Sequence, residues 1–537
     1  MNRKTFFTLV SAAVLAALGI KSFFKKNVFQ LNALKSNAAN GHKIRDKKIL
    51  KPNRPDESKI QISTQVIIVG GGISGLIAAK ELKANQIPFL LLELENESGG
   101  NAISGENKVS AFPWGAHYLP VPNLNQPKLI KFLEEIEVIT GYNEQHLPIY
   151  DEFALCAEPE ERLFIHKYWQ EGLIPEFGLN AKDHEDIQAF FSLINNYKNA
   201  IGSDKKEAFC IPIAHCSQDP IYLQLDQITF LEFLKKHQLR SKYLHWYLNY
   251  CCNDDFGTSL EKTSAWAGIH YFAARKGIAA NAKADDVLTW PEGNNYLVKK
   301  IKHNISNHIQ TNSLVCHVEE IKPGIIWVNY QNTESGASQD LFCHQVIMAT
   351  PQFINKRIVQ SYPKLETNFE YNPWLIANIT TRPLVNSKGL EMCWDNVLFN
   401  SPSLGYINAS HQSLNSRHQQ YVLTYYLPLC QKTAKEERKV AYEKTNEEWA
   451  ELVLSDLEKA HPDIREKVDE ISLKLWGHAM ISPMPHVIWN AEKEKLLQHS
   501  KNIIYAHTDL SGMSIFEEAF YQGVQAANTI IASNTNE

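Results

Sequence analysis

Three spaced glycines could bind the diphosphate of a dinucleotide. Gly70, Gly72 and Gly75 form a G-x-G-x-x-G pattern, and Ser74 lies between the last two of them. This spacing suits a tight turn, close approach of the backbone to a pyrophosphate, and close packing of a helix on a strand. A helix that starts there directs unpaired N–H groups and the positive end of its dipole at the phosphates. We therefore expect these four residues to contact a dinucleotide.

The surrounding elements are those of a βαβ unit. Residues 65–69 form a β-branched run typical of a buried parallel strand, residues 76–85 carry a helical apolar face, and residues 89–92 form a second strand. Glu93 ends that strand 18 residues after Gly75, where a carboxylate can accept hydrogen bonds from both ribose hydroxyls of an adenosine. Together these elements predict a Rossmann-like dinucleotide-binding unit.

Downstream residues resemble those of one flavoprotein superfamily. Gly99 and Gly100 follow the acid by six and seven residues, as in the E-x-x-x-x-x-G-G-R run of two-motif flavoproteins, with Asn101 in place of the arginine. Gly115 and Ala116 resemble the G-A-x segment near the flavin. On these residues the chain is similar to the FAD-dependent amine oxidase, protoporphyrinogen oxidase and phytoene desaturase superfamily. The resemblance implies FAD as the cofactor and places all five residues beside it.

The C-terminal region resembles the second motif of that superfamily. A strand expected at 502–506 precedes a helix expected over 515–531, and residues 517–527 resemble the pattern E-G-A-x-x-S-G-x-x-A-A. By resemblance, Asp509 contacts the ribityl and phosphate part of FAD. Backbone N–H groups at the helix start would face the pyrimidine end of the flavin, where negative charge accumulates on reduction. Those groups belong to Met513, Ser514 and Ile515.

Three middle segments also resemble parts of an FAD-binding domain. Residues 290–297 resemble its P-x-G-G-x-x-x-L entry into a helix, and residues 345–351 resemble its V-I-x-A-x-P strand. Residues 314–318 resemble a strand whose valine, here Val318, pairs its backbone with adenine. The predicted fold is α/β, a Rossmann-like FAD-binding domain interleaved with an α+β substrate-binding domain. We expect FAD-binding parts at 61–126, 290–353 and 486–537, and substrate-domain parts at 127–289 and 354–485.

Candidate catalytic residues follow from the same resemblance. Amine oxidases hold a water near the flavin N5 with a lysine, and counting from Ala349 places that position on Arg357, with Lys356 beside it. The position of the aromatic wall falls on Ile515, which weakens the simple-amine interpretation. Residues 251–257 could be a helix end followed by a turn, or a substrate contact. Three histidines could line the flavin cavity: His117, His478 and His486.

Three functional hypotheses remain open at this point. The favoured one is an FAD-dependent oxidoreductase that takes a hydride from a C–N or C–C bond of a small organic substrate and passes electrons to oxygen or a quinone. Within it, amine oxidation competes with porphyrinogen oxidation or polyene desaturation. The second is an NAD(P)-dependent enzyme, in which the C-terminal motif would have no use. The third is a flavin-binding partner protein without turnover, suggested by the residues at 101, 357 and 515.

Composition excludes several other classes of protein. The chain has 537 residues, 44% of them apolar, and a net charge of -5. A length of this kind can bury a sizeable core, and an acidic chain lacks the basic face that nucleic acids need. The nine cysteines form no CxxC pair. We therefore expect buried free thiols rather than a zinc or iron–sulfur site.

The first 60 residues differ from the rest in charge. They carry a net charge of +10, whereas residues 61–537 carry -15. The apolar run at 6–20 is short for a membrane span and suits a signal peptide, and Arg3-Lys4 resembles the start of a twin-arginine export signal. An uncleaved membrane anchor is the alternative. We expect export to the periplasm or anchoring by the N-terminus, with residues 27–59 as a basic linker.

Overall fold

The computed structural model describes residues 29–535, apart from 50, 367–368, 386 and 414–418. The apolar run at 6–20 lies outside the described residues. Within the described part of the chain, no helix combines the length and the apolar character needed to cross a membrane. Export and a membrane tether therefore stay predictions.

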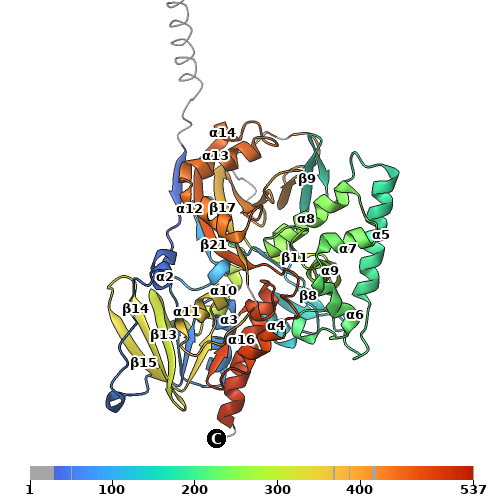
Figure 1. Cartoon of the computed structure of the whole chain (residues 1–537). Coiled ribbons are helices and arrows are strands. Elements are labelled where there is room, and N and C mark those ends of the chain that lie inside the picture. Colours follow the sequence, from blue (N-terminus) through green and yellow to red (C-terminus); the bar gives the residue numbers. More distant parts are fainter. Residues whose placement is uncertain (1–28, 50, 367–368, 386, 414–418, 536–537) are drawn as a thin grey trace, which may run out of the picture.

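A five-stranded parallel sheet forms the centre of one domain (Figure 1). The strand order β12-β3-β2-β16-β22 brings the early, middle and late parts of the chain into one sheet, and every pair is parallel. The predicted Rossmann-like α/β unit is confirmed. The strands are β2 (Val66–Val69), β3 (Phe89–Leu92), β12 (Ile309–Gln310), β16 (Gln345–Met348) and β22 (Ile503–Tyr505).

Helices cover one face of this sheet and an antiparallel sheet covers the other. In β2, Val66 and Ile68 pack into the core with the helices, while Ile67 and Val69 pack toward the second sheet. Burial on both faces explains why β2 is continuously apolar. The helices are α3 (Ile73–Ala84), α4 (Pro127–Glu135), α10 (Asn295–Lys302) and α16 (Phe516–Thr535). The second sheet consists of β13 (Ser313–Lys322), β14 (Ile325–Asn332) and β15 (Ser338–Cys343).

An eight-stranded mixed sheet forms the second domain, in the order β1-β21-β17-β20-β19-β18-β9-β10. Its strands are β1 (Gln30–Ala33), β9 (Glu161–Ile165), β10 (Tyr168–Glu171), β17 (Tyr371–Thr381), β18 (Asp395–Leu398), β19 (Tyr406–Asn408), β20 (Tyr421–Pro428) and β21 (Val468–Ile481). One face packs against α12 (Ala434–Glu443) and α13 (Asn446–Leu457). The other packs against α8 (Lys242–Phe256), within a helical cluster that also contains α5 (Ala181–Lys198), α7 (Phe230–Lys236) and α9 (Ala265–Ala273). The predicted α+β domain is present and interleaved with the first.

Shorter elements complete the described chain. Three two-stranded sheets pair β4 (Ser104–Glu106) with β5 (Ala111–Pro113), β7 (Ile139–Tyr142) with β8 (Pro148–Tyr150), and β6 (Tyr118–Pro120) with β11 (Val287–Thr289). The remaining α-helices are α2 (Ala38–Arg45), α6 (Pro220–Leu223), α11 (Gln352–Ile358), α14 (Ile464–Lys467) and α15 (Glu492–Leu497).

The segment predicted as a basic linker, 27–59, contains β1 and α2. β1 is only four residues long and lies at a sheet edge, paired in parallel with β21. α2 has no fully buried residue. Because both elements are short and mostly polar, neither has the apolar period by which a strand or helix can be predicted from sequence.

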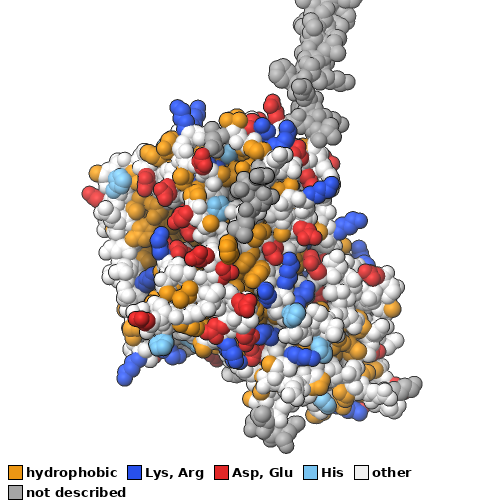
Figure 2. Space-filling model, turned by 180° about the vertical axis from the view of Figure 1, so that it is seen from behind, with side chains coloured by type: hydrophobic (Ala, Val, Ile, Leu, Met, Phe, Trp, Pro, Cys, Tyr) orange, Lys and Arg blue, Asp and Glu red, His pale blue; other side chains and the backbone are white. Residues whose placement is uncertain are grey.

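Charged side chains of both signs mix on the surface. Figure 2 shows acidic and basic groups interspersed over the face opposite to that of Figure 1. Among the described residues on that face, no continuous basic area is visible.

Candidate active site

The glycine-rich turn forms one wall of the main cavity, which has a volume of about 390 Å³. Gly70 has a φ of +103°, and a Cβ on Gly75 would lie 2.0 Å from the Gly70 carbonyl oxygen, so both positions require glycine. A Cβ on Gly72 would meet no atom within 4 Å. Gly72 therefore faces open space at the N-cap of α3, where a diphosphate would meet the helix N-terminus.

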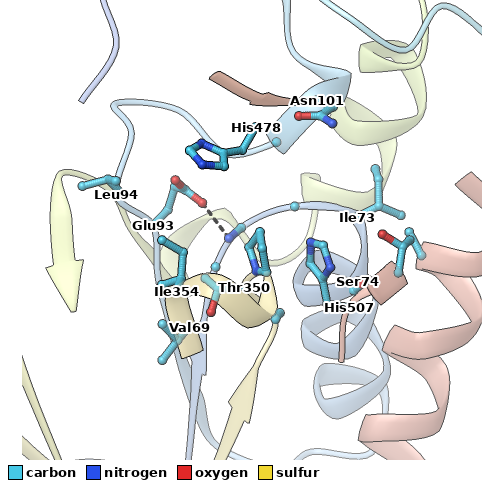
Figure 3. Close-up of a pocket in the computed structure, with 18 of the residues that line it drawn as sticks. Val69, Ile73, Ser74, Glu93, Leu94, Asn101, Thr350, Ile354, His478 and His507 are labelled. Carbon is cyan, nitrogen blue, oxygen red and sulfur yellow. Dashed lines mark hydrogen bonds between the residues drawn. The ribbon is translucent and has the colours of Figure 1, made fainter. Parts of the chain in front are cut away.

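Glu93 lies at the end of β3 and holds the glycine turn in place (Figure 3). Its Oε2 accepts a hydrogen bond from the Gly71 N–H at 2.6 Å, and its Oε1 accepts one from the Glu95 N–H at 2.8 Å. Burial raises the pKa of this carboxyl, and the two backbone N–H groups oppose that shift. Glu93 lines the main cavity, where its carboxylate can receive the hydroxyls of a ribose.

The predicted flavin-proximal residues meet where the main cavity joins a second one. Gly99, Gly100, Asn101 and Ala116 line the main cavity. A Cβ on Gly115 would lie 2.2 Å from the Asn101 carbonyl oxygen, so this close approach requires glycine. The Asn101 side chain donates a hydrogen bond to the Ala479 carbonyl at 2.5 Å. Asn101 thus ties the FAD-domain loop to β21 of the other domain, a contact that differs from the arginine of the superfamily pattern.

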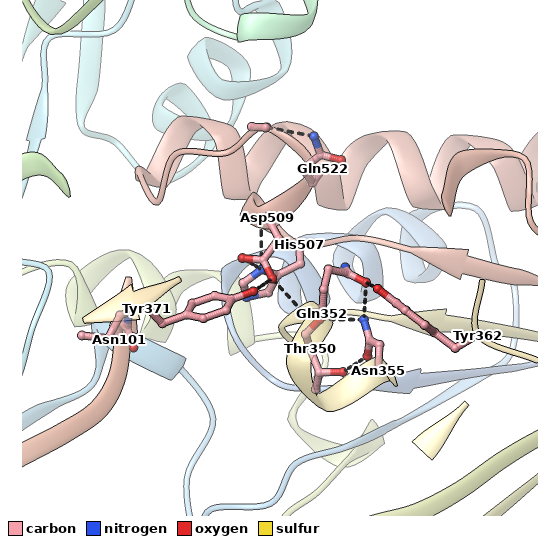
Figure 4. Close-up of polar contacts among 11 residues, drawn as sticks. Asn101, Thr350, Gln352, Asn355, Tyr362, Tyr371, His507, Asp509 and Gln522 are labelled. Carbon is pink, nitrogen blue, oxygen red and sulfur yellow. Dashed lines mark hydrogen bonds and ion pairs between the residues drawn. The ribbon is translucent and has the colours of Figure 1, made fainter. Parts of the chain in front are cut away.

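The C-terminal loop that precedes α16 lines part of the main cavity, but the predicted FAD contact in this loop does not. His507 and Thr508 line the main cavity, while Asp509 is fully buried and is not among the lining residues. Asp509 Oδ2 accepts hydrogen bonds from the Gln352 N–H, at 2.7 Å, and from the Tyr371 hydroxyl (Figure 4). The structure therefore places Asp509 as a link between this loop, α11 and β17.

The start of α16 lies between the two cavities. Ser514 and Ile515 line both of them, whereas Met513 is buried in the helical core. Glu518, in place of a glycine in the superfamily pattern, is buried and accepts hydrogen bonds from the Ile213 N–H and the Ser511 hydroxyl. This carboxyl joins the C-terminal loop to the helical cluster.

The remaining sequence candidates lie farther from the enclosed part of the cavity. Val318 is buried in β13, and it is Val315, three residues earlier, that lines the main cavity. Arg357 is exposed on α11, lines the cavity and donates to the Phe353 carbonyl. Lys356 is exposed and does not line either cavity. Neither cation lies in the inner cavity described next.

The second cavity, called the inner cavity below, has a volume of about 150 Å³ and aromatic walls. The aromatic-wall position of amine oxidases falls on Ile515, which is not aromatic. Aromatic side chains on strands of the other domain line this cavity instead, and the sequence pattern did not indicate them. Three of them come from the eight-stranded sheet: Trp374, Tyr426 and Trp476. The Tyr426 hydroxyl donates to the Gly115 carbonyl at 2.9 Å, which fixes one ring against the flavin-proximal loop.

Carboxyl groups form another wall of the inner cavity. Asp254, Asp255 and Glu517 line it together with Arg275. Arg275 is bound through one nitrogen to both oxygens of Asp255, at 2.7 and 2.8 Å. Burial raises the pKa of Asp254 to about 7, with the neighbouring Asp255 acting in the same direction, and burial also raises that of Glu517 to about 7. The Tyr118 hydroxyl donates to Asp254 at 3.2 Å.

Two of the three candidate histidines line a cavity. His117 lines the inner cavity, where burial lowers its pKa to about 4, so the imidazole is neutral at pH 7. His478 lines the main cavity and stacks on Phe353, with ring centroids 4.4 Å apart. His486 lines neither cavity. Segment 251–257 ends α8 at a left-handed Gly257, as the helix-end interpretation predicted. It also supplies two carboxyls that line the inner cavity, and a substrate contact there stays a prediction.

The residues present fit an FAD. The open space at Gly72 suits a diphosphate, Glu93 suits a ribose, and Val315 lines the same cavity. At the opposite end, Asn101, Ala116 and Ile515 belong to both cavities, so a ring system there would also face the inner one. Residues of the glycine motif and of the C-terminal motif therefore line one cavity, whereas Val318, Asp509 and Met513 of the predicted set lie outside its lining.

Comparison with known proteins agrees with this geometry. Residues 68–136 match the NAD(P)-binding Rossmann-like domain family. An L-amino acid dehydrogenase from Synechocystis sp. is 22% identical over 502 residues, covering 87% of this chain and 95% of that protein.

Solved structures of similar fold include two amine oxidases. Cyclohexylamine oxidase from Brevibacterium oxydans superposes with a TM-score of 0.64 at 14% identity, covering 88% of this chain and 100% of the other. Putrescine oxidase bound to putrescine gives a TM-score of 0.61 at 13% identity, covering 87% and 99%. A fatty acid isomerase from P. acnes gives 0.60 at 14%, covering 88% and 99%. The expected resemblance is confirmed at the level of the fold: this chain has the architecture of these oxidases, with a Rossmann-like domain at its centre.

Proposed function

We propose that this protein is an FAD-dependent oxidoreductase that oxidises the C–N bond of an amine with a net positive charge. One observation carries the proposal: an aromatic inner cavity with three carboxyls and one paired guanidinium opens onto the predicted flavin end of the main cavity. Bound flavin supplies the two-electron acceptor for such a reaction. The superfamily resemblance, and the amine oxidases of the same fold, support this class of chemistry.

The chain's own residues would bind and orient the amine. Asp254 and Glu517 offer carboxylate oxygens to an ammonium group, and the Tyr118 hydroxyl holds Asp254 in position. Trp374 and Trp476 give the cavity apolar walls that would keep water from the amine. The Trp476 ring already carries the Lys474 ammonium, 4.0 Å from its centroid. The neutral imidazole of His117 adds no positive charge that would repel the substrate.

Large apolar substrates fit the cavity less well. An inner cavity of about 150 Å³ with buried carboxyls does not suit a porphyrinogen or a polyene. We therefore rank these alternatives below an amine, and we propose oxygen or a quinone as the electron acceptor.

An α-amino acid is the second candidate substrate, because Arg275 could receive its carboxylate. The L-amino acid dehydrogenase relative agrees with this alternative. Against this alternative, the Arg275 guanidinium already donates a hydrogen bond to the Asp255 carboxylate at 2.7 Å.

Anaerobic mixing of the purified holoprotein with monoamines, diamines and amino acids tests the proposal. We expect amines to bleach the flavin absorbance and Asp254→Asn to raise their apparent Kd at least about tenfold, as expected for loss of a buried charge partner. If amines are the substrates, Arg275→Gln should still allow amines to reduce the flavin. If amino acids are the substrates, Arg275→Gln should abolish flavin reduction by amino acids. A protein that binds no added FAD, or a flavin that no nitrogen compound in the panel reduces, would refute the proposal.

A further inference from the structure

The segment 30–48 connects the two domains across the outside of the main cavity. β1 pairs with β21 over four residue pairs, and the Leu34 N–H then donates to the Leu473 carbonyl at 2.8 Å. The chain next crosses to the FAD-binding domain and forms α2, which lies at the junction of the two domains (Figure 1).

The crossing is anchored directly beside the predicted ribose site. The Ser36 hydroxyl donates to Glu95 Oε1, and the Asn37 N–H donates to Glu95 Oε2, both at 2.8 Å. The Asn37 side chain donates to the Leu94 carbonyl at 3.0 Å. Leu94 and Glu95 immediately follow Glu93, so the anchor holds the same loop that carries the ribose carboxylate.

α2 supplies part of the cavity wall. Gly41 and Ile44 line the main cavity, on which Ile354 of α11 and His478 of β21 also border. Ile44 packs against the apolar core between the two sheets of the FAD-binding domain. Figure 3 shows His478 on the side of the cavity that faces Glu93. A ligand in this half of the cavity would therefore be enclosed by α2 as well as by the FAD-binding domain.

The contacts that hold α2 are few. No residue of this helix is fully buried. It is held by the Ser36 and Asn37 hydrogen bonds, by the packing of Ile44, and by an edge contact of His42 with Tyr442 of α12, whose ring centroids are 6.1 Å apart. Elements with few buried contacts open locally at a free-energy cost well below that of global unfolding. α2 can thus detach while the two domains stay folded.

We propose that residues 30–48 form a clasp that belongs to the cofactor site. Docked, the clasp closes the adenosine half of the main cavity, and it undocks when the dinucleotide enters or leaves. The clasp rests on the proposed function in that its ligand is FAD. It adds Gly41, Ile44 and the Ser36–Asn37 anchor to the binding residues, none of which the glycine and C-terminal motifs include.

The rate of FAD release from the full-length holoprotein tests this proposal. In Ile44→Asp, a carboxylate replaces the apolar contact of α2, and in the double variant Ser36→Ala, Asn37→Ala the side-chain hydrogen bonds of the anchor are lost. We expect both to release FAD about tenfold faster than the parent on dilution, followed by the rise in flavin fluorescence. Lys43→Asp is the matched control, because the neighbouring Lys43 is exposed on the same helix, and its release rate should equal that of the parent.

Hydrogen exchange gives a second readout that does not depend on turnover. We expect amides of residues 37–46 to exchange more slowly in the FAD-bound protein than in the apoprotein. Parent-like release in both clasp variants, together with exchange that FAD leaves unchanged, would overturn the clasp while leaving the proposed function standing. A parent protein that binds no FAD would refute both. Far-UV circular dichroism checks that Ile44→Asp is folded, and the double variant keeps the test decisive if it is not.

Discussion

Asp254 is a partly buried carboxyl, and its ionisation contributes to the charge of the inner cavity. Its pKa is raised from 3.8 to about 7, so between these values the folded protein keeps a proton that the unfolded chain releases. Stability contributed by this group is therefore lost as pH rises through that window. We predict that Asp254→Asn, which cannot ionise, gains stability relative to the parent between pH 5 and pH 8. Melting temperatures of both proteins across this range provide the measurement.

The control for this prediction is an exposed carboxyl. Glu152→Gln should change the melting temperature by the same small amount at pH 5 and pH 8, because Glu152 is exposed on the surface. If the difference between Asp254→Asn and the parent also stays constant with pH, the buried carboxyl does not titrate in this range and the prediction is wrong.

Glu93 combines two tasks: it accepts hydrogen bonds from the Gly71 and Glu95 N–H groups, and it offers a carboxylate to a ribose. Glu93→Gln keeps the side-chain shape but removes the charge that two ribose hydroxyls would use, and its NH2 group can no longer accept one of the two backbone hydrogen bonds. Hydrogen bonds to charged groups contribute about 1.5–3 kcal/mol each, so we expect FAD to bind about 10–100-fold more weakly. Titration calorimetry of the apoprotein measures this. The control is Glu97→Gln, an exposed position four residues later, which should bind FAD like the parent. If Glu93→Gln also bound FAD as tightly as the parent, Glu93 would have no role in binding the ribose.

Residues near the dinucleotide motif could be predicted from sequence, because a local backbone conformation demands them. Gly70 and Gly75 are required by a turn and a close approach that the spacing alone implies. Asp254, Arg275 and Trp476 could not be predicted as neighbours, because they meet only through contacts between distant segments. Arg357, the position that the family spacing indicates, is exposed on α11 and lines the main cavity but not the inner one.

At the scale of elements, the turn between β2 and α3 makes two different demands on its glycines. A Cβ on Gly75 would collide with the Gly70 carbonyl at 2.0 Å, whereas one on Gly72 would enter open cavity space. We predict that Gly75→Ala loses both stability and cofactor binding, because α3 must move away from β2. Gly72→Ala should keep the parent's midpoint in urea yet bind FAD at least about tenfold more weakly. Equal loss of stability in the two variants would contradict this assignment.

Whether an element could be predicted depends on what stabilises it. The strands β2, β3 and β16, which were predicted, lie in the buried core and therefore show mostly apolar runs. β1 and α2 are stabilised instead by backbone pairing with β21 and by polar contacts with Glu95, which leave no period in the sequence. Asp509 is a similar case, since its role as a link to Gln352 and Tyr371 depends on partners more than 130 residues away in the chain.

At the scale of the whole molecule, the cofactor would act as a structural bridge. The main cavity is lined by residues from α2, the turn after β2, the strand β13, the helix α11, β21 and the C-terminal loop. A ligand that contacts all of these segments in the folded state and none in the unfolded state stabilises the protein by mass action, by about 2.7 kcal/mol at a concentration of 100 times its Kd. Both domains should therefore unfold together at a higher temperature when the ligand is bound.

The same stabilisation by a bound ligand can identify the dinucleotide that the main cavity binds. Residues 68–136 match an NAD(P)-binding Rossmann-like family, yet the inner cavity adjoins the main one at Ser514 and Ile515, where the second flavoprotein motif begins. We predict that FAD raises the melting temperature of the apoprotein in proportion to the logarithm of its concentration above Kd, whereas NAD⁺ and NADP⁺ at the same concentrations leave it unchanged. Differential scanning calorimetry with the three ligands makes the comparison, and Glu93→Gln should shift the FAD curve to higher concentration. Only a ligand with the correct length and charge can contact every segment of the cavity at once. If NAD⁺ or NADP⁺ raised the melting temperature as much as FAD or more, the main cavity would therefore be a nicotinamide dinucleotide site.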